Sequence, residues 1–152
     1  MKTKTMKVVA IASGGGHWIQ LQRIVPAFAG HDVSYISTHP SFAATVPGHA
    51  FYAVPDASRW NKVKLLKVGY ELFRLISTIK PDVIISTGAA PGLMALLAGK
   101  LTGARTIWLD SIANIEKISM SGQIALRFAD RTYTQWPKLA TDKVQFAGNV
   151  LS

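Results

Sequence analysis

The 152-residue sequence contains no cysteine, which excludes disulfide bonds, zinc sites built on thiolates and cysteine nucleophiles. Acidic residues are also scarce: 8 Asp and Glu stand against 17 Lys and Arg, and the formal net charge is +9. This positive balance favours an anionic partner such as nucleic acid, an acidic membrane surface or a phosphate group.

Long hydrophobic runs are missing as well. The apolar run 8–12 is too short for a signal peptide, and no run approaches the roughly 20 residues that cross a bilayer. With 49% hydrophobic and 16% charged residues, the composition is that of a packed globular protein. We therefore expect one soluble or peripheral domain spanning residues 1–152.

Short apolar segments alternate with segments of helical periodicity along the chain. Strands are expected at 8–12, 33–37, 51–54, 83–87, 106–109, 131–135 and 144–146, and helices at 18–28, 60–79, 92–101 and 121–129. This alternation predicts an α/β fold, a single Rossmann-like domain with a mainly parallel sheet. Ligands of such sheets bind beyond the carboxyl ends of the strands, where the loops 13–17, 87–92 and 110–121 should converge.

A glycine-rich turn follows the first expected strand. Its residues are Ser13, Gly14, Gly15, Gly16 and His17. Glycines let the backbone approach a ligand, and the start of a helix favours an anion, so the turn predicts phosphate or diphosphate binding. The alternative is a tight turn that only lets the helix pack. Known nucleotide fingerprints do not fit, because the third glycine of the dinucleotide motif would fall at Ile19 and the P-loop Lys-Ser/Thr pair is missing.

Two residues at this edge are candidate catalytic bases. His17 lies at a helix start, and Asp110 ends a buried strand. Each could instead have a structural role, Asp110 as a helix cap. Neighbouring loop residues that could contact the same ligand are Thr87, Gly88, Ser111, Asn114, Ser121 and Gly122. The remaining histidines lack the spacing of metal ligands, so we expect neither a metal nor a cofactor.

The segment 59–80 carries six basic residues against Glu71 alone, which is over half of the net charge. Its apolar arc is wider than one contact with a sheet requires. A basic amphipathic helix with tryptophan at its start favours an anionic membrane surface, with Trp60, Lys64, Lys67 and Arg74 as the contacting residues. The alternative is a sheet-packed helix with a solvated basic edge. Nucleic acid is disfavoured because no recognised reading motif accompanies the charge.

With these segments in place, the chain resembles the asparagine-linked glycosylation protein fourteen family and its bacterial capsule and exopolysaccharide relatives. The resemblance extends over nearly the full length, and its motifs are Ser13–His17, Pro81–Gly88, Ser119–Gly122, Ala129–Pro137 and Phe146–Asn149. It implies the N-terminal, acceptor-side half of a split GT-B glycosyltransferase, whose UDP-sugar is held by a separate chain. By analogy with the peptidoglycan N-acetylglucosaminyltransferase, which joins both halves, residues 14–17 would face the acceptor's diphosphate.

Two features depart from the family pattern. The membrane-spanning helix that begins eukaryotic members is missing, which favours a bacterial-type peripheral protein on the cytoplasmic face of the cell membrane. Members often carry Glu-Ser followed by Arg where this chain has Asp110, Ser111 and Asn114. The last residue follows Gly148 and Asn149 closely, where the second half of a fused enzyme would begin, so we expect half an enzyme.

The resemblance thus implies a subunit of a two-chain transferase that moves sugar from a UDP-sugar to a polyprenyl-diphosphate-linked saccharide and is inactive without its donor-binding partner. Two alternatives stay open. One is a pure membrane adaptor that tethers and stabilises the catalytic chain. The other is a self-sufficient small nucleotide-binding enzyme, against which the missing third glycine argues.

Overall fold

The computed structural model describes residues 4–56 and 61–151, and seven strands in these ranges form one sheet that is parallel throughout. The strand order is β3-β2-β1-β4-β5-β6-β7. The strands are β1 (Lys7–Ile11), β2 (Asp32–Ser37), β3 (Ala50–Ala53), β4 (Val83–Ser86), β5 (Arg105–Leu109), β6 (Arg131–Thr134) and β7 (Val144–Phe146). Every predicted strand is confirmed to within a residue or so at its ends.

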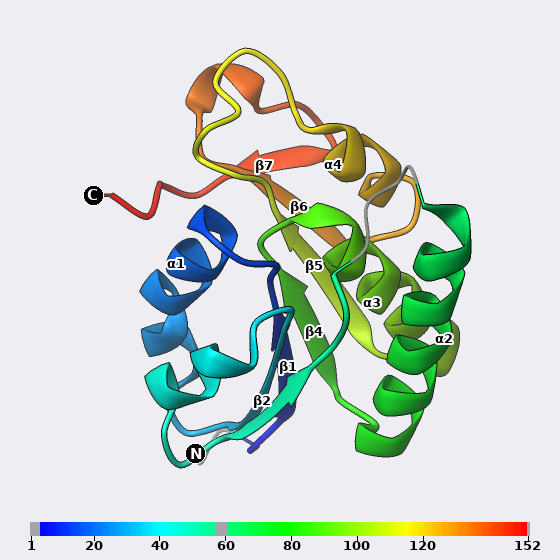
Figure 1. Cartoon of the computed structure of the whole chain (residues 1–152). Coiled ribbons are helices and arrows are strands. Elements are labelled where there is room, and N and C mark those ends of the chain that lie inside the picture. Colours follow the sequence, from blue (N-terminus) through cyan, green and yellow to red (C-terminus); the bar gives the residue numbers. More distant parts are fainter. Residues whose placement is uncertain (1–3, 57–60, 152) are drawn as a thin grey trace.

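In the part of the chain that the structure describes, four α-helices and three 3₁₀ turns connect the strands (Figure 1). They are α1 (Gly16–Arg23), η1 (Val25–Phe28), η2 (Pro40–Thr45), α2 (Lys62–Ile79), α3 (Ala89–Thr102), α4 (Met120–Ala125) and η3 (Pro137–Leu139). The prediction of one helix over 18–28 is wrong. Pro26 has no backbone N–H and cannot continue an α-helix, so α1 ends at Arg23 and the chain goes on as the separate turn η1. The helix expected over 121–129 likewise ends early, at Ala125.

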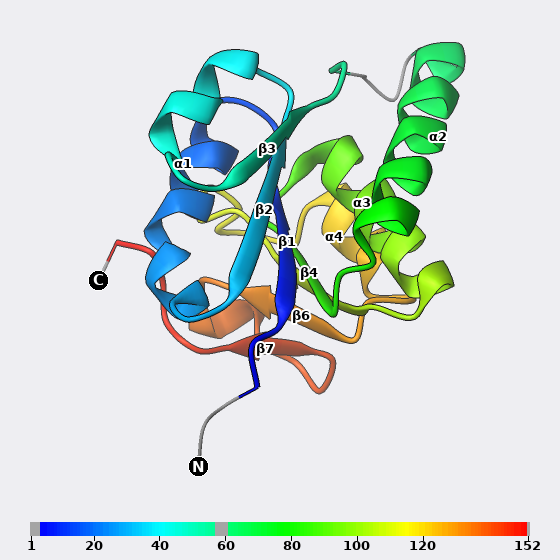
Figure 2. The same cartoon turned by 90° about the horizontal axis from the view of Figure 1, so that it is seen from below.

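The helices form two layers on opposite faces of the sheet (Figure 2). On one face, α1 buries Trp18 and Leu21 against Tyr35 of β2. On the other, α2 and α3 pack on the central strands, where Leu72 and Trp108 are almost fully buried. No helix in the described residues is long and apolar enough to cross a membrane.

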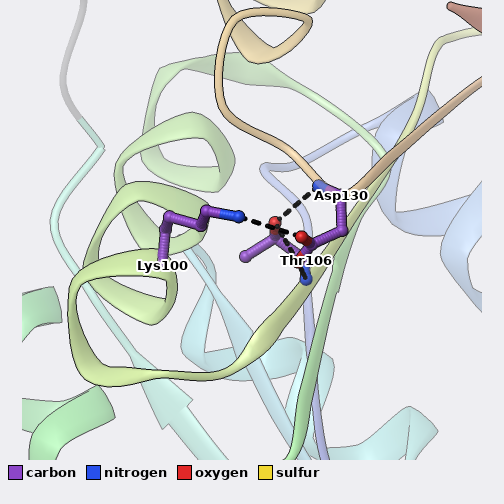
Figure 3. A network of polar contacts seen from close by, with 3 residues as sticks. All are labelled: Lys100, Thr106 and Asp130. Atoms are coloured by element: carbon purple, nitrogen blue, oxygen red, sulfur yellow. Dashed lines mark hydrogen bonds and ion pairs between the residues drawn. The ribbon is translucent and has the colours of Figure 1, made fainter.

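A polar cluster ties α3 to the amino ends of β5 and β6 (Figure 3). Lys100 of α3 lies 2.9 Å from the Asp130 carboxylate. The other Asp130 oxygen accepts bonds from the Thr106 amide (2.8 Å) and hydroxyl (3.2 Å), and that hydroxyl in turn accepts from the Asp130 amide (3.0 Å). The hydrogen bond from Lys100, followed by that from the Thr106 backbone, lowers the pKa of Asp130 below its ordinary value.

Replacing Asp130 by Asn should therefore destabilise the protein in a pH-dependent way. We expect the Asp130→Asn variant to lose about 1 kcal/mol of unfolding free energy at pH 7, since the site is partly exposed. Because the pKa of Asp130 is lower in the folded state than the unfolded value of about 3.9, the ionised carboxylate stabilises the folded protein at pH values above 3.9. This stabilisation is lost as the pH falls through the folded-state pKa. Urea unfolding should thus show the difference from wild type shrinking below about pH 4.

Glu116→Gln is the matched control, because this carboxylate is 90% exposed and lies 4.0 Å from Lys138. It should leave stability unchanged at either pH. A difference between Asp130→Asn and wild type that stayed constant in acid would contradict the assignment.

Candidate functional site

The candidate site lies where the sheet changes its winding direction. β1 and β4 are neighbours, but the chain continues from β1 towards β2 on one side and from β4 towards β5 on the other. The loops that leave these two strands diverge at their carboxyl ends and open a crevice between them. The sequence predicted this edge, and the loops after β1, β4 and β5 do come together there.

His17 and Thr87 connect the first two of these loops. The His17 Nδ1 atom lies 3.1 Å from the Thr87 carbonyl oxygen, and the Thr87 hydroxyl donates to the His17 carbonyl at 2.7 Å. Because a carbonyl oxygen only accepts, Nδ1 carries the proton in this contact, which leaves Nε2 as the acceptor. The arrangement thus fixes the imidazole in a half-buried position with one ring nitrogen able to take a proton.

The turn from β4 into α3 fits closely around the same imidazole. Gly88 has a φ of 149°, and a Cβ atom there would overlap the His17 ring. Ala89, which begins α3, has a φ of 69°, in the left-handed region that non-glycine residues rarely adopt. Such conformations cost free energy and cluster at functional sites. A residue larger than glycine at position 88 would displace His17.

Asp110 organises the third loop. Only 1% of this residue is exposed, and its carboxylate accepts four hydrogen bonds. Oδ1 accepts from Trp108 Nε1 (3.0 Å) and the Ser119 hydroxyl (2.5 Å), while Oδ2 accepts from Asn114 Nδ2 (3.1 Å) and the Ser119 amide (3.0 Å). Gly122 packs so closely that a Cβ would lie 2.7 Å from Oδ1. All these bonds keep residues 110–122 folded back on the end of β5.

The three loops enclose a cleft of about 340 Å³. It is lined by His17, Gly88, Ala89, Trp108, Asp110, Ser111, Ala113, Asn114, Ser119, Met120 and Ser121. Six of the residues predicted from the sequence line the cleft: His17, Gly88, Asp110, Ser111, Asn114 and Ser121. Thr87 and Gly122 do not line it but contact His17 and Asp110, respectively.

The first four residues of the glycine turn, 13–16, do not line this cleft. Ser13 is buried, and Gly14 lies against the His39 ring, where a side chain would clash. Gly15 and Gly16 are exposed at the start of α1, which has no side-chain cap. Gly15 also needs its glycine identity for a φ of 67°. The turn therefore presents the amino end of α1 beside the cleft.

A buried glutamine pair behind the cleft was not predicted. Gln135 Nε2 donates to Gln20 Oε1 (2.6 Å) and to the Asp110 carbonyl (3.0 Å), and Gln135 Oε1 accepts from the Val150 amide (3.0 Å). Gln20 also binds the loop after Asp110, through Ser111 and the Ile112 amide. The pair joins α1, the Asp110 loop and the C-terminal tail. Glutamine is common on surfaces, so only the tertiary contacts distinguish these two.

The basic helix α2 keeps an unusual share of its apolar surface exposed. Val68, Leu72 and Ile76 face the sheet and are fully buried. The wide apolar arc predicted from the sequence is confirmed, because four large apolar residues remain in solvent: Val63 (79%), Leu66 (74%), Tyr70 (63%) and Phe73 (42%). Lys64, Lys67 and Arg74 are exposed among them, and Trp60 lies outside the described residues.

Solved structures with the same architecture show the class of fold. The MurG structure of Acinetobacter baumannii superposes with a TM-score of 0.77 at 18% identity, over 95% of this chain and 46% of that one. A UDP-N-acetylglucosamine 2-epimerase of Rickettsia bellii gives 0.73 at 12% identity, over 97% and 46%. The fold is thus the Rossmann-like half of the GT-B type.

The family follows from the sequence match. Residues 56–150 match the family model "Oligosaccharide biosynthesis protein Alg14 like", and the chain belongs to this family. The Yarrowia lipolytica "UDP-N-acetylglucosamine transferase subunit ALG14" is 37% identical over 73 residues, 44% of this chain and 34% of that protein. The mouse subunit of that name is 24% identical, over 90% of this chain and 78% of its own length. The chain thus spans about a third of the fungal relative.

The contact between Gly88 and His17 predicts how the cleft responds to one added methyl group. Gly88→Ala places a Cβ against the imidazole at a φ unfavourable for alanine, so the unfolding free energy should fall by about 2 kcal/mol. The control is Gly16→Ala, because nothing lies within 4 Å of its added Cβ. In thermal unfolding, the Tm of Gly88→Ala should be lower than that of wild type, while the Tm of Gly16→Ala should be unchanged. Equal midpoints for both variants would contradict this packing.

Proposed function

We propose that this chain is the acceptor-binding, membrane-associating subunit of a two-chain glycosyltransferase. The enzyme would transfer a sugar from a UDP-sugar to a polyprenyl-diphosphate-linked saccharide, in capsule, exopolysaccharide or lipid-linked oligosaccharide synthesis. The observation that carries the proposal is the His17 cleft at the switch point of a chain that belongs to the Alg14-like family. The relatives named as transferase subunits support the two-chain arrangement.

The acceptor's diphosphate would lie at the amino ends of α1 and α3, beside Gly15, Gly16 and Gly88. Helix amino ends carry unpaired N–H groups and a positive partial charge, which favour a phosphate. The adjoining cleft would hold the acceptor sugar, with Ser111, Asn114 and Ser121 as hydrogen-bonding groups. Its volume of about 340 Å³ is within the range typical of small-ligand sites.

His17 is the general base in this proposal. Nε2 would take the proton of the acceptor hydroxyl as its oxygen bonds to the anomeric carbon of the donor sugar. The bond from that carbon to the UDP phosphate breaks, UDP leaves with the electron pair, and the anomeric configuration inverts. Asp110 is the second candidate base, but its four accepted hydrogen bonds favour a positioning role. The larger part of the rate gain would come from holding the two substrates together across the two chains.

The exposed surface of α2 would hold the chain on the inner face of the cell membrane. Apolar side chains at 63, 66, 70 and 73 share the helix surface with Lys64, Lys67 and Arg74. Apolar insertion and cationic attraction together are the two signals that stable peripheral binding requires. This would place the cleft near a lipid-linked acceptor.

The direct test of the proposal is purification of the tagged chain from its native membrane fraction, followed by mass spectrometry and a transfer assay. We expect a stoichiometric second chain with a UDP-sugar-binding domain, and transfer only when both chains are present. Recovery of this chain alone, still able to turn over a UDP-sugar, would refute the two-chain proposal and favour a self-sufficient enzyme.

In the purified complex, His17→Ala should lower kcat by about 10²- to 10⁴-fold, the usual contribution of a general base. Binding of the partner chain and the Tm should change little, because the Thr87 hydroxyl still bonds to the backbone of residue 17. His49→Ala, an exposed histidine outside the cleft, is the control. Full activity of His17→Ala with an intact complex would instead favour a pure membrane adaptor.

Membrane binding is tested with the triple variant Lys64→Glu, Lys67→Glu, Arg74→Glu. Its affinity for vesicles containing 30 mol% phosphatidylglycerol should fall at least tenfold in co-sedimentation, because each basic residue near an anionic surface contributes about 1 kcal/mol. The control is Arg127→Glu, Lys138→Glu, Lys143→Glu, which makes the same change in net charge elsewhere. Equal losses in both variants would mean that overall charge, and not α2, drives binding.

A further inference from the structure

Ser111 lines the cleft, and two neighbouring groups hold its hydroxyl oxygen. The Gln20 side-chain amide lies 3.1 Å from this oxygen, and the Ala113 backbone amide also lies 3.1 Å from it. A hydroxyl group has two lone pairs and one proton to donate. If both neighbours donate to Ser111, its two lone pairs are used, and its proton must point in another direction.

The backbone determines which end of the Gln20 side chain faces Ser111. The Ala113 amide can only donate, so the open question is whether Gln20 offers its NH₂ group or its carbonyl oxygen, which are told apart by their partners. The other end of the Gln20 amide lies 3.0 Å from the Ile112 backbone N–H. Because a backbone N–H never accepts, that end is Oε1, and the NH₂ group faces Ser111.

Gln135 holds Gln20 in the same orientation. Gln135 Oε1 accepts from the Val150 amide at 3.0 Å, which identifies the opposite end of this side chain as the NH₂ group. That group donates to the Asp110 carbonyl oxygen at 3.0 Å and to Gln20 Oε1 at 2.6 Å. Gln20 and Gln135 are 7% and 1% exposed, so both amides are shielded from water. Backbone groups thus fix the donor and acceptor ends of the two glutamines.

The consequence is that Ser111 turns its proton towards the cleft. Around the tetrahedral hydroxyl oxygen, Cβ and the two donated hydrogens take three directions, and the proton takes the fourth. Within residues 4–56 and 61–151, no group accepts a hydrogen bond from this hydroxyl. Ser111 is half-buried at the cleft wall, so the open side of its oxygen is the side that a ligand reaches.

We propose that Ser111 is a specificity-determining residue that donates a hydrogen bond to an oxygen of the acceptor saccharide, and that Gln20 positions its proton. The choice of ligand rests on the function proposed above, in which the cleft holds the acceptor sugar. A hydroxyl, ring or carbonyl oxygen satisfies this donor, whereas a protonated amine at the same place does not, because it only donates. A sugar that lacks the oxygen leaves the donor unpaired and binds less tightly.

The first test is the acceptor KM of the purified two-chain complex, with lipid extracted from the native membrane fraction as the acceptor. Ser111→Ala should raise this KM about tenfold and change kcat by less than about twofold, because it removes a neutral hydrogen bond made in the ground state and the transition state alike. Ser34→Ala, a half-buried serine of β2 outside the cleft, is the matched control and should change neither constant. An unchanged KM for Ser111→Ala would overturn the inference.

The role of Gln20 is tested by reversing the polarity of Ser111 without removing it. The carboxylate introduced by Gln20→Glu still accepts from Ile112 and Gln135, but it also accepts from the Ser111 hydroxyl, whose proton then points away from the cleft. Gln20→Glu should therefore raise the acceptor KM as much as Ser111→Ala, and the double variant should be no worse than either single variant. Additive increases would mean that the new charge acts on the acceptor directly and that Gln20 does not position Ser111.

Neutron diffraction from the deuterated full chain measures the same feature without substrate, and it remains decisive if the buried carboxylate prevents Gln20→Glu from folding. We expect the Ser111 deuteron on the cleft side of the oxygen and a Gln20 Nε2 deuteron directed at that oxygen. A Ser111 deuteron directed at Gln20 contradicts the inference.

The outcomes separate this inference from the function on which it rests. If the wild-type complex transfers sugar while Ser111→Ala keeps the wild-type acceptor KM, the inference fails and the proposed function stands. If the wild-type complex transfers no sugar, the proposed function fails, and the ligand assigned to Ser111 fails with it.

Discussion

The reversal of winding direction between β1 and β4 is the constraint on which the other features of this protein depend. Right-handed crossovers must lie on opposite faces when the chain moves in opposite directions along the sheet. The reversal therefore separates α1 from α3 and opens the crevice in which the His17 cleft lies. Within the described residues, the same constraint leaves β4–β6 without an α-helix on the α1 side. The cleft and this uncovered face of the sheet are two consequences of one topology.

Polar contacts, rather than packed apolar side chains, hold the loops of the cleft in place. Asp110 is buried with four donors around its carboxylate, and Gln135 joins the same loop to Gln20 and to the C-terminal tail. A buried carboxylate without partners would cost several kcal/mol, so the loop can fold only in the arrangement that supplies all of them. Contacts within the chain thus hold the loop at the edge of the cleft. The link from Gln135 to Val150 also connects the cleft to the tail.

The likeness to longer solved structures concerns the fold. The chain covers 46% of the MurG structure that it resembles and shares that fold at 18% identity. Under the function proposed above, the cleft would work together with a donor-binding site on a second chain. The exposed apolar and basic surface of α2 lies on the opposite face of the sheet from α1.

The sequence by itself determined the positions of the strands, their parallel direction in an α/β domain and the edge at which the loops meet. These features follow from local patterns, because each apolar run or glycine-rich turn extends over only a few neighbouring residues. It was wrong about the helix over 18–28, where Pro26 overrides the periodicity. Only the tertiary structure decided that His17 is held by Thr87, that Asp110 accepts four hydrogen bonds, and that Gln20 meets Gln135 across 115 positions. Such contacts join residues far apart in the chain. They depend on distances that no local pattern encodes.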